Sequence, residues 1–172
     1  MRLKGICKFV AAGMAAVAIM AAPSAIRAQG GATVLTAADA QKLLPASVFY
    51  SGQSATTQLR NSGGVKFADG FYVLATLVDT SGYSTGLAAK YQAYFITELP
   101  IKVGGKSLPA GVYGAGFVGD KFVLTDVGAH DVLTVAAGDD AAQKRPMPLQ
   151  VTADPSGGFR LYVQRKYVSF IR

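Results

Sequence analysis

The sequence predicts an all-β protein: a single antiparallel β-barrel or β-sandwich of about 8–10 short strands, preceded by one short helix. From residue 46 onward the chain is rich in Val, Thr, Tyr, Phe and Ile, and Gly, Asp, Asn or Pro interrupts it about every 8–12 positions. Nine of its ten acidic residues are Asp, which helices accept less readily than Glu. No long helical pattern separates the expected strands, so the sheet is not built from parallel crossovers.

The first 28 residues have the layout of a cleaved secretory signal peptide. Residues 1–8 are basic, residues 9–22 are apolar, Pro23 ends the apolar run, and Ala28 is a small residue suited to the cleavage position. The run is shorter than the roughly 20 residues that a membrane-spanning helix needs, and no later segment reaches that length. We therefore expect bacterial-type export to the periplasm or the cell exterior, with no stable membrane span after cleavage.

Charge and cysteine content narrow the possible partners. Removing residues 1–28 takes away four basic residues and no acid, so the formal net charge falls from +7 to +3. This charge is too small for the dense basic surface that nucleic acid requires, and we expect no nucleic-acid partner. The only cysteine, Cys7, is removed as well, so the remaining chain has no thiol nucleophile, disulfide or thiolate metal site. We expect no cofactor and no bound metal.

The elements follow one another along a single domain. We expect a flexible lead-in at residues 29–35 and one antiparallel β domain over residues 36–172. Thr36 can cap a helix over residues 37–44, Asp39 suits its first turn, and Pro45 ends it. The expected strands are residues 47–51, 55–60, 65–68, 71–79, 90–99, 101–103, 106–108, 111–118, 121–127, 130–136, 147–154, 158–164 and 166–171.

Turns separate these strands, and alternation shows how they pack. Asp69-Gly70, Gly104-Gly105 and Gly119-Asp120 are typical of tight hairpins, residues 61–64 read as a turn, and residues 80–89 and 138–146 read as polar loops. Both faces of residues 71–79 are apolar, which indicates a central strand. In residues 111–118, Gly114 and Gly116 share a face that can admit another backbone or a ligand. Consecutive hairpins slightly favour a closed barrel over a two-layer sandwich.

Aromatic residues are the best candidates for a binding site. Tyr72, Tyr94 and Tyr113 each lie in the middle of an expected strand, and Phe117 follows Tyr113 on the same face. Small-molecule cavities in β domains are commonly lined by aromatic rings and a few polar atoms. Ordinary cross-strand packing is the alternative role for these side chains.

Polar candidates lie in two further groups. Asp126, His130 and Asp131 bring the only histidine close to two carboxylates, as a metal site or a general base would. The same residue types form turns, and one histidine without cysteine makes a zinc site hard to assemble, so we favour a turn. Arg160, Tyr162, Gln164 and Lys166 alternate along one strand face, which we interpret as a solvent-facing, edge-protecting surface rather than a binding surface.

Together these features predict an exported, non-catalytic β-domain protein that binds a small apolar or aromatic ligand or an envelope component, such as a glycan or a protein. One alternative is a structural or interaction module of the cell envelope. A weaker alternative is a small hydrolase or metal-dependent enzyme that uses Asp126, His130 and Asp131.

Overall fold

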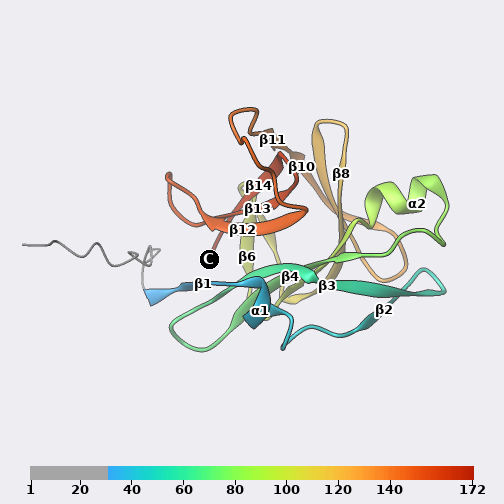
Figure 1. Cartoon of the computed structure of the whole chain (residues 1–172), viewed down its shortest axis with the longest axis horizontal. Coiled ribbons are helices and arrows are strands. Elements are labelled where there is room, and N and C mark those ends of the chain that lie inside the picture. The colour runs from blue at the N-terminus through green and yellow to red at the C-terminus, as the bar shows by residue number, and fades with distance from the viewer. Residues whose placement is uncertain (1–30) are drawn as a thin grey trace, which may run out of the picture.

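The computed structural model describes residues 31–172, which form two antiparallel β-sheets and two short helices (Figure 1). This confirms the all-β prediction. The first sheet has the order β1-β3-β4-β5-β8-β9-β10, with β2 paired to β3, and the second has the order β12-β13-β14-β6-β7, with β11 paired to β14. The first sheet contains β1 (Thr33–Leu35), β2 (Ser47–Tyr50), β3 (Gln53–Lys66), β4 (Tyr72–Val78), β5 (Ala93–Thr97), β8 (Gly111–Val118), β9 (Lys121–Thr125) and β10 (Asp131–Ala136). The second contains β6 (Ile101–Val103), β7 (Lys106–Leu108), β11 (Gly138–Asp139), β12 (Leu149–Ala153), β13 (Phe159–Val163) and β14 (Lys166–Ile171).

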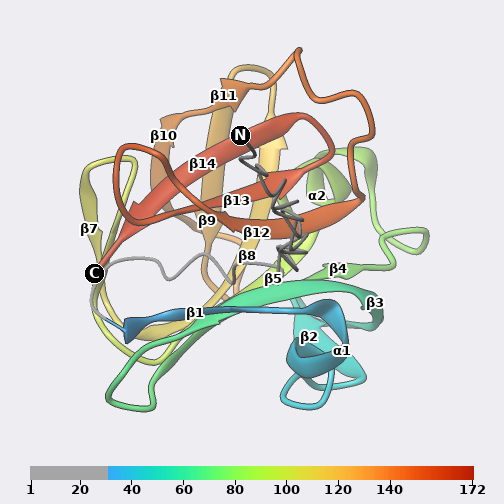
Figure 2. The same ribbon diagram turned by 60° about the vertical axis from the view of Figure 1, so that its left-hand side comes forward.

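The first sheet curves around the second, but their ladders do not join. At one side β3 lies against β12, where Gly63 meets the Val151 backbone. At the other side β10 lies against the β6–β7 hairpin, where the Lys106 Nζ donates to the Thr134 carbonyl at 3.0 Å. Figure 2 shows β12, β13 and β14 in front of β8 and β9 as separate layers. The slightly favoured barrel is therefore wrong, and the described residues form the two-layer alternative.

Aromatic rings hold the two sheets together. Phe95 of β5 contacts Phe170 of β14 edge-on, with ring centroids 6.3 Å apart, and Phe170 contacts Phe159 of β13 at 5.5 Å. Phe67 meets Phe159 edge-on at 6.0 Å. All four side chains are buried in the inter-sheet core. Burial of rings of this size is the main favourable contribution to a core that has no disulfide.

Strand β3 corrects one expectation directly. The sequence predicts a turn between two strands at residues 61–64, yet these residues continue one strand that is bulged between Gln58 and Ser62. The Asn61 side chain donates to the Gln58 Oε1 across this bulge at 2.9 Å. Gly64 is needed for close approach rather than for turning, because a Cβ there would lie 2.5 Å from the Val73 carbonyl oxygen.

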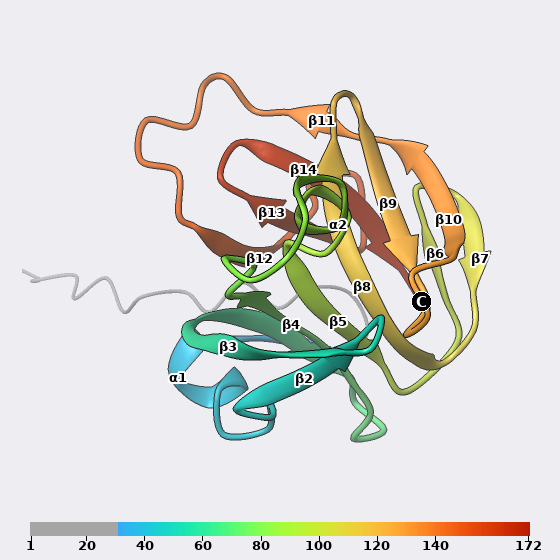
Figure 3. The same cartoon turned by 90° about the vertical axis from the view of Figure 1, so that its right-hand side faces the viewer.

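The helices differ from the expectation in length and number. Helix α1 (Ala37–Ala40) starts where predicted, and the Thr36 Oγ1 accepts the Asp39 amide at 3.2 Å, but the helix ends before residue 44. Helix α2 (Thr85–Lys90) lies in the segment expected as a polar loop, and it delays the start of β5 to Ala93. Figure 3 shows α2 against β8. Gly116 allows α2 to pack closely on β8, because a Cβ at this position would overlap the Ala89 carbonyl oxygen.

The outer face of the second sheet carries a buried ion pair. The Arg160 Nε and Nη2 donate to the two Asp154 carboxylate oxygens at 2.8 and 3.1 Å, while the Ser169 hydroxyl and the Ser156 amide donate to the same carboxylate at 2.7 and 2.9 Å. The guanidinium also lies over the Tyr167 ring, 4.4 Å from its centroid. Burial opposes the ionisation of Asp154, but these donors outweigh it and lower the pKa of Asp154 to about 2.

The structure covers only part of the amino-terminal region for which the sequence makes predictions. The signal peptide expected at residues 1–28 lies outside the described residues. The lead-in expected at residues 29–35 is shorter, because Thr33–Leu35 form β1 and pair with residues 64–66 of β3. Between residues 31 and 172, neither helix is long and apolar enough to span a bilayer.

Candidate functional site

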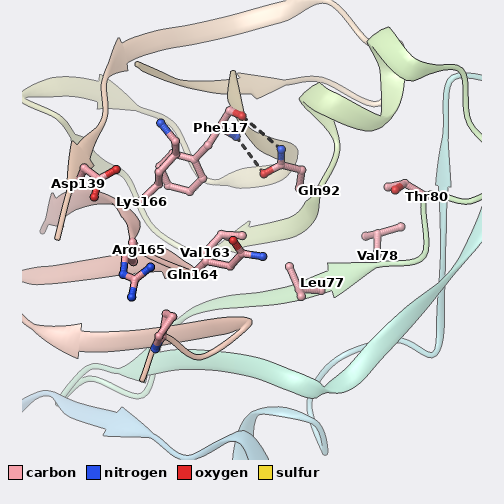
Figure 4. Close-up of a pocket in the computed structure, with 11 residues that line it drawn as sticks. Leu77, Val78, Thr80, Gln92, Phe117, Asp139, Val163, Gln164, Arg165 and Lys166 are labelled. Carbon is pink, nitrogen blue, oxygen red and sulfur yellow. Dashed lines mark hydrogen bonds between the residues drawn. The ribbon is translucent and has the colours of Figure 1, made fainter. Parts of the chain in front are cut away.

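A cleft of about 520 Å³ opens where the two sheets diverge at one end (Figure 4). Its first wall comes from the end of β4, the segment before β5 and the end of β8. Its second wall comes from the β13–β14 hairpin, β11 and the loop that follows β11. The lining residues are Leu77, Val78, Thr80, Gln92, Phe117, Asp139, Pro146, Val163, Gln164, Arg165 and Lys166. Ligand pockets for small molecules are commonly about 300–1,000 Å³.

The deeper part of the cleft is apolar. Phe117 points inward because its side of β8 faces the core, and its ring packs on Phe122 with centroids 4.9 Å apart. Leu77 and Val163 approach from opposite sheets and are each partly buried against the same core. This floor would accept an apolar group by removing it from water.

On the first wall of the cleft, the Gln92 side chain forms the hydrogen bonds that a further β5–β8 backbone pair would form. The β5–β8 ladder ends at the pair Ala93 and Ala115. Beyond it, the Gln92 Nε2 donates to the Phe117 carbonyl and the Gln92 Oε1 accepts the Phe117 amide, both at 3.2 Å. The dashed lines in Figure 4 mark these two bonds. The side chain therefore satisfies backbone groups at the cleft wall that would otherwise face the apolar floor.

The second wall is basic. The Lys166 Nζ donates to the Gly119 carbonyl at 2.5 Å, and the Arg165 Nε donates to the Gln143 carbonyl at 3.3 Å. Asp139 is the only acid in the lining, and it faces Lys166 in the β11–β14 ladder. Its carboxylate makes no hydrogen bond or ion pair within residues 31–172. The two cations and one carboxylate leave this wall with a positive charge.

Gln164 is held in an unusual backbone conformation at the tip of this wall. Val163 and Lys166 are paired, so Gln164 and Arg165 form a two-residue hairpin loop. Gln164 has φ of 56°, in the left-handed region that such a loop usually fills with glycine. Its backbone amide donates to the Met147 carbonyl at 3.1 Å and to the Pro148 carbonyl at 3.2 Å. This conformation costs a non-glycine residue roughly 1–2 kcal/mol.

The four aromatic residues expected to bind a ligand do not share one cavity. Phe117 lines the cleft, and Tyr113 lies on the same buried face of β8, where its hydroxyl donates to the Pro109 carbonyl at 3.1 Å. Tyr72 and Tyr94 lie on the outer face of the first sheet, in the apolar cluster that α1 covers. Burial raises the pKa values of Tyr94 and Tyr113, so both hydroxyls stay neutral.

Two residues expected on a solvent-facing surface instead belong to the cleft. Arg160 and Tyr162 lie on the outer face of β13, within the Asp154 network, but the expectation that they face solvent is wrong, because Tyr162 is buried and Arg160 is only partly exposed. Gln164 and Lys166 do not continue that face, because the hairpin turns at Gln164 and Arg165 and brings them to the cleft.

A second aromatic cluster carries no signal that singles it out in the sequence. Tyr50 stacks on Tyr91 with ring centroids 3.7 Å apart, and Tyr83 lies 6.2 Å from each. The Tyr50 hydroxyl shares a 2.8 Å hydrogen bond with Thr125, and both residues are fully buried. Burial raises the pKa of Tyr91. The cluster packs α2 against the part of the first sheet that contains β2.

Asp126 and His130 flank the turn between β9 and β10, where Asp126 organises the backbone, and Asp131 is the first residue of β10. Its Oδ1 accepts the amides of Gly128 and His130, each at 2.9 Å, and these backbone bonds with the His130 side chain lower the pKa of Asp126. His130 lies 3.1 Å from Asp126 but is 82% exposed, and Asp131 pairs with Lys90 at 2.7 Å. Within residues 31–172 no group of three His, Cys, Asp or Glu side chains could hold a metal ion.

Fold and cleft together define a two-sheet antiparallel β domain with an end-on pocket. Comparison of the chain with family models, curated proteins and solved structures finds no match.

Proposed function

We propose that this protein is an exported, non-catalytic binding protein that holds a small molecule with an apolar body in the cleft between its two sheets. The observation that carries the proposal is a cleft of about 520 Å³ with an apolar floor and a polar rim. Its volume and lining match the general properties of small-molecule sites. Export is supported by the signal-like residues 1–28.

The floor and the rim have separate roles in this proposal. Leu77, Phe117 and Val163 would take up the apolar body, and Gln164, Arg165 and Lys166 at the other wall would orient its polar end. Gln92 is already bound to the Phe117 backbone and would keep the wall in place without a ligand. A wall built in advance lowers the entropy cost of binding.

Fluorescence of N-phenyl-1-naphthylamine, a neutral apolar probe, tests the proposal. The purified protein should bind it saturably at one site, and Leu77→Trp, which fills the floor, should weaken binding by tenfold or more. Val112→Trp is the matched control, because Val112 is 47% exposed at the opposite end of β8. No saturable binding, or equal loss in both variants, contradicts the proposal.

A further inference from the structure

We infer that the cleft selects an amphipathic anion, whose acidic head group is bound by Arg165 and Gln164. This inference rests on the proposed function and specifies its ligand class. The ligand would combine an apolar body with a carboxylate, phosphate or sulfonate group at one end.

The second wall of the cleft carries a net positive charge. Among its lining residues, Arg165 and Lys166 oppose one carboxylate, that of Asp139. Asp139 is the direct strand neighbour of Lys166, and the Nζ of that lysine is already bound to the Gly119 carbonyl. Arg165 has no acidic side chain within ion-pair distance in residues 31–172, and its charge is the one that a ligand can neutralise. An anion at the cleft rim is therefore favoured, and a cation is disfavoured.

The side chains of Arg165 and Gln164 have hydrogen-bond donors left for a ligand. Among residues 31–172, the one hydrogen-bond partner of the Arg165 guanidinium is the Gln143 carbonyl, which accepts from Nε, so the terminal nitrogens keep their N–H groups for another acceptor. The Gln164 side-chain amide makes no hydrogen bond to a described residue, and Figure 4 shows it reaching toward Leu77. Planar guanidinium and amide donors suit the oxygen atoms of an acidic group.

The strained backbone conformation of Gln164 also favours a role in ligand contact. Glycine would occupy the φ of 56° without cost, but it would lack the amide. The backbone is fixed by two carbonyl groups, those of Met147 and Pro148, so the side chain is projected from a rigid point. Local strain retained at a cleft-lining residue is typical of positions that contact a ligand.

A matched pair of probes tests the inference. 1-Anilinonaphthalene-8-sulfonate carries a sulfonate on the ring system of the neutral N-phenyl-1-naphthylamine, so the ratio of their affinities measures the head-group contribution. We expect the protein to prefer the sulfonate by about tenfold, which corresponds to about 1.4 kcal/mol. Added salt should reduce the preference, because the charges at the rim are solvent-accessible.

Variants then assign the preference to residues. Arg165→Gln should remove this preference, by weakening binding of the sulfonate more than binding of the neutral probe. Lys102→Gln removes the same charge from an exposed position in β6, at the other end of the second sheet, and should leave the preference intact. Gln164→Gly should fold at least as stably, because it relieves the backbone strain, yet bind the sulfonate several-fold more weakly.

The outcomes separate this inference from the proposed function. If neither probe binds, the proposed function fails. If the neutral probe binds equally well or better, or if Lys102→Gln lowers the preference as much as Arg165→Gln, only the anion inference is overturned. Flotation with phosphatidylglycerol vesicles distinguishes the source: a protein that stays in solution takes a dissolved amphiphile, and flotation that Leu77→Trp abolishes indicates a bilayer lipid.

Discussion

Replacing Asp154 with Asn should destabilise the fold strongly at neutral pH and much less in acid. The substitution keeps the shape of the side chain but removes its charge. Arg160 is only 22% exposed and would lose its counter-ion, while Asp154 itself is 4% exposed. Removing one partner of a buried pair generally costs about 3–5 kcal/mol. Because Arg160 keeps its contact with Tyr167, we expect the lower end, about 3 kcal/mol, at pH 7.

The pH dependence follows from the pKa of Asp154, which folding lowers from 3.8 to about 2. The folded state favours the ionised carboxylate, so its contribution is complete above pH 3.8 and is lost as the pH falls toward 2. A shift of this size corresponds to about 2.4 kcal/mol. At pH 2 the unsubstituted protein has lost most of that amount, and its advantage over the Asn variant should shrink to about 1 kcal/mol.

Urea unfolding of both proteins at pH 7 and pH 2 measures these differences. Asp120→Asn is the control, since Asp120 is an exposed turn residue whose side chain makes no hydrogen bond to the described residues. The reasoning is refuted if the Asn variant loses less than about 1 kcal/mol at pH 7. It is also refuted if the loss is the same at both pH values, because the ion pair would then not be the cause.

Three further predictions concern packing and the turn. Thr125→Val should cost about 1–3 kcal/mol in urea unfolding, because the buried Tyr50 hydroxyl loses its partner, whereas equal stability would mean that this hydroxyl finds another acceptor. Gly116→Ala should displace α2 and speed hydrogen exchange of its amides, with unchanged exchange counting against the close contact. Asp126→Ala should lower the melting temperature more than His130→Ala, and the opposite order would show that the imidazole rather than the carboxylate holds the turn.

Much of the fold is accessible from the sequence because its signals are local. Thr36 caps α1 as expected, β8 spans the expected residues 111–118, and Gly104 and Gly105 both adopt positive φ in a tight hairpin. Each of these depends on residues next to one another in the chain. The choice between barrel and sandwich depends on whether distant strands pair, which neighbouring residues do not specify.

Glycine explains one of the errors, and helix length explains another. Residues 61–64 contain Gly63 and Gly64, and glycine serves a turn and a close backbone approach equally well, so only the position of Val151 and Val73 decides between them. Helix α2 has six residues and no side-chain cap at Ser84. Its stability comes from packing against β8, which is a tertiary effect.

The candidate site is predictable only in part. Alternation places Phe117 on a buried face, and it does line the cleft. Tyr72 and Tyr94 alternate just as regularly, but the face they occupy is covered by α1. Gln164 and Arg165 gain their role from a hairpin turn without glycine, a signal that the composition of the segment conceals.

Because both sheets line the cleft, a ligand bound there should raise the free energy of unfolding of the whole domain. Leu77 and Phe117 belong to one sheet and Val163 to the other, so a molecule between them joins two layers that no hydrogen-bonded ladder connects. Unfolding separates these layers and must release the guest. At a free concentration one hundred times its dissociation constant, the guest would add about 2.7 kcal/mol to the free energy of unfolding. A rise in melting temperature in the presence of one compound of a library can therefore identify the guest directly.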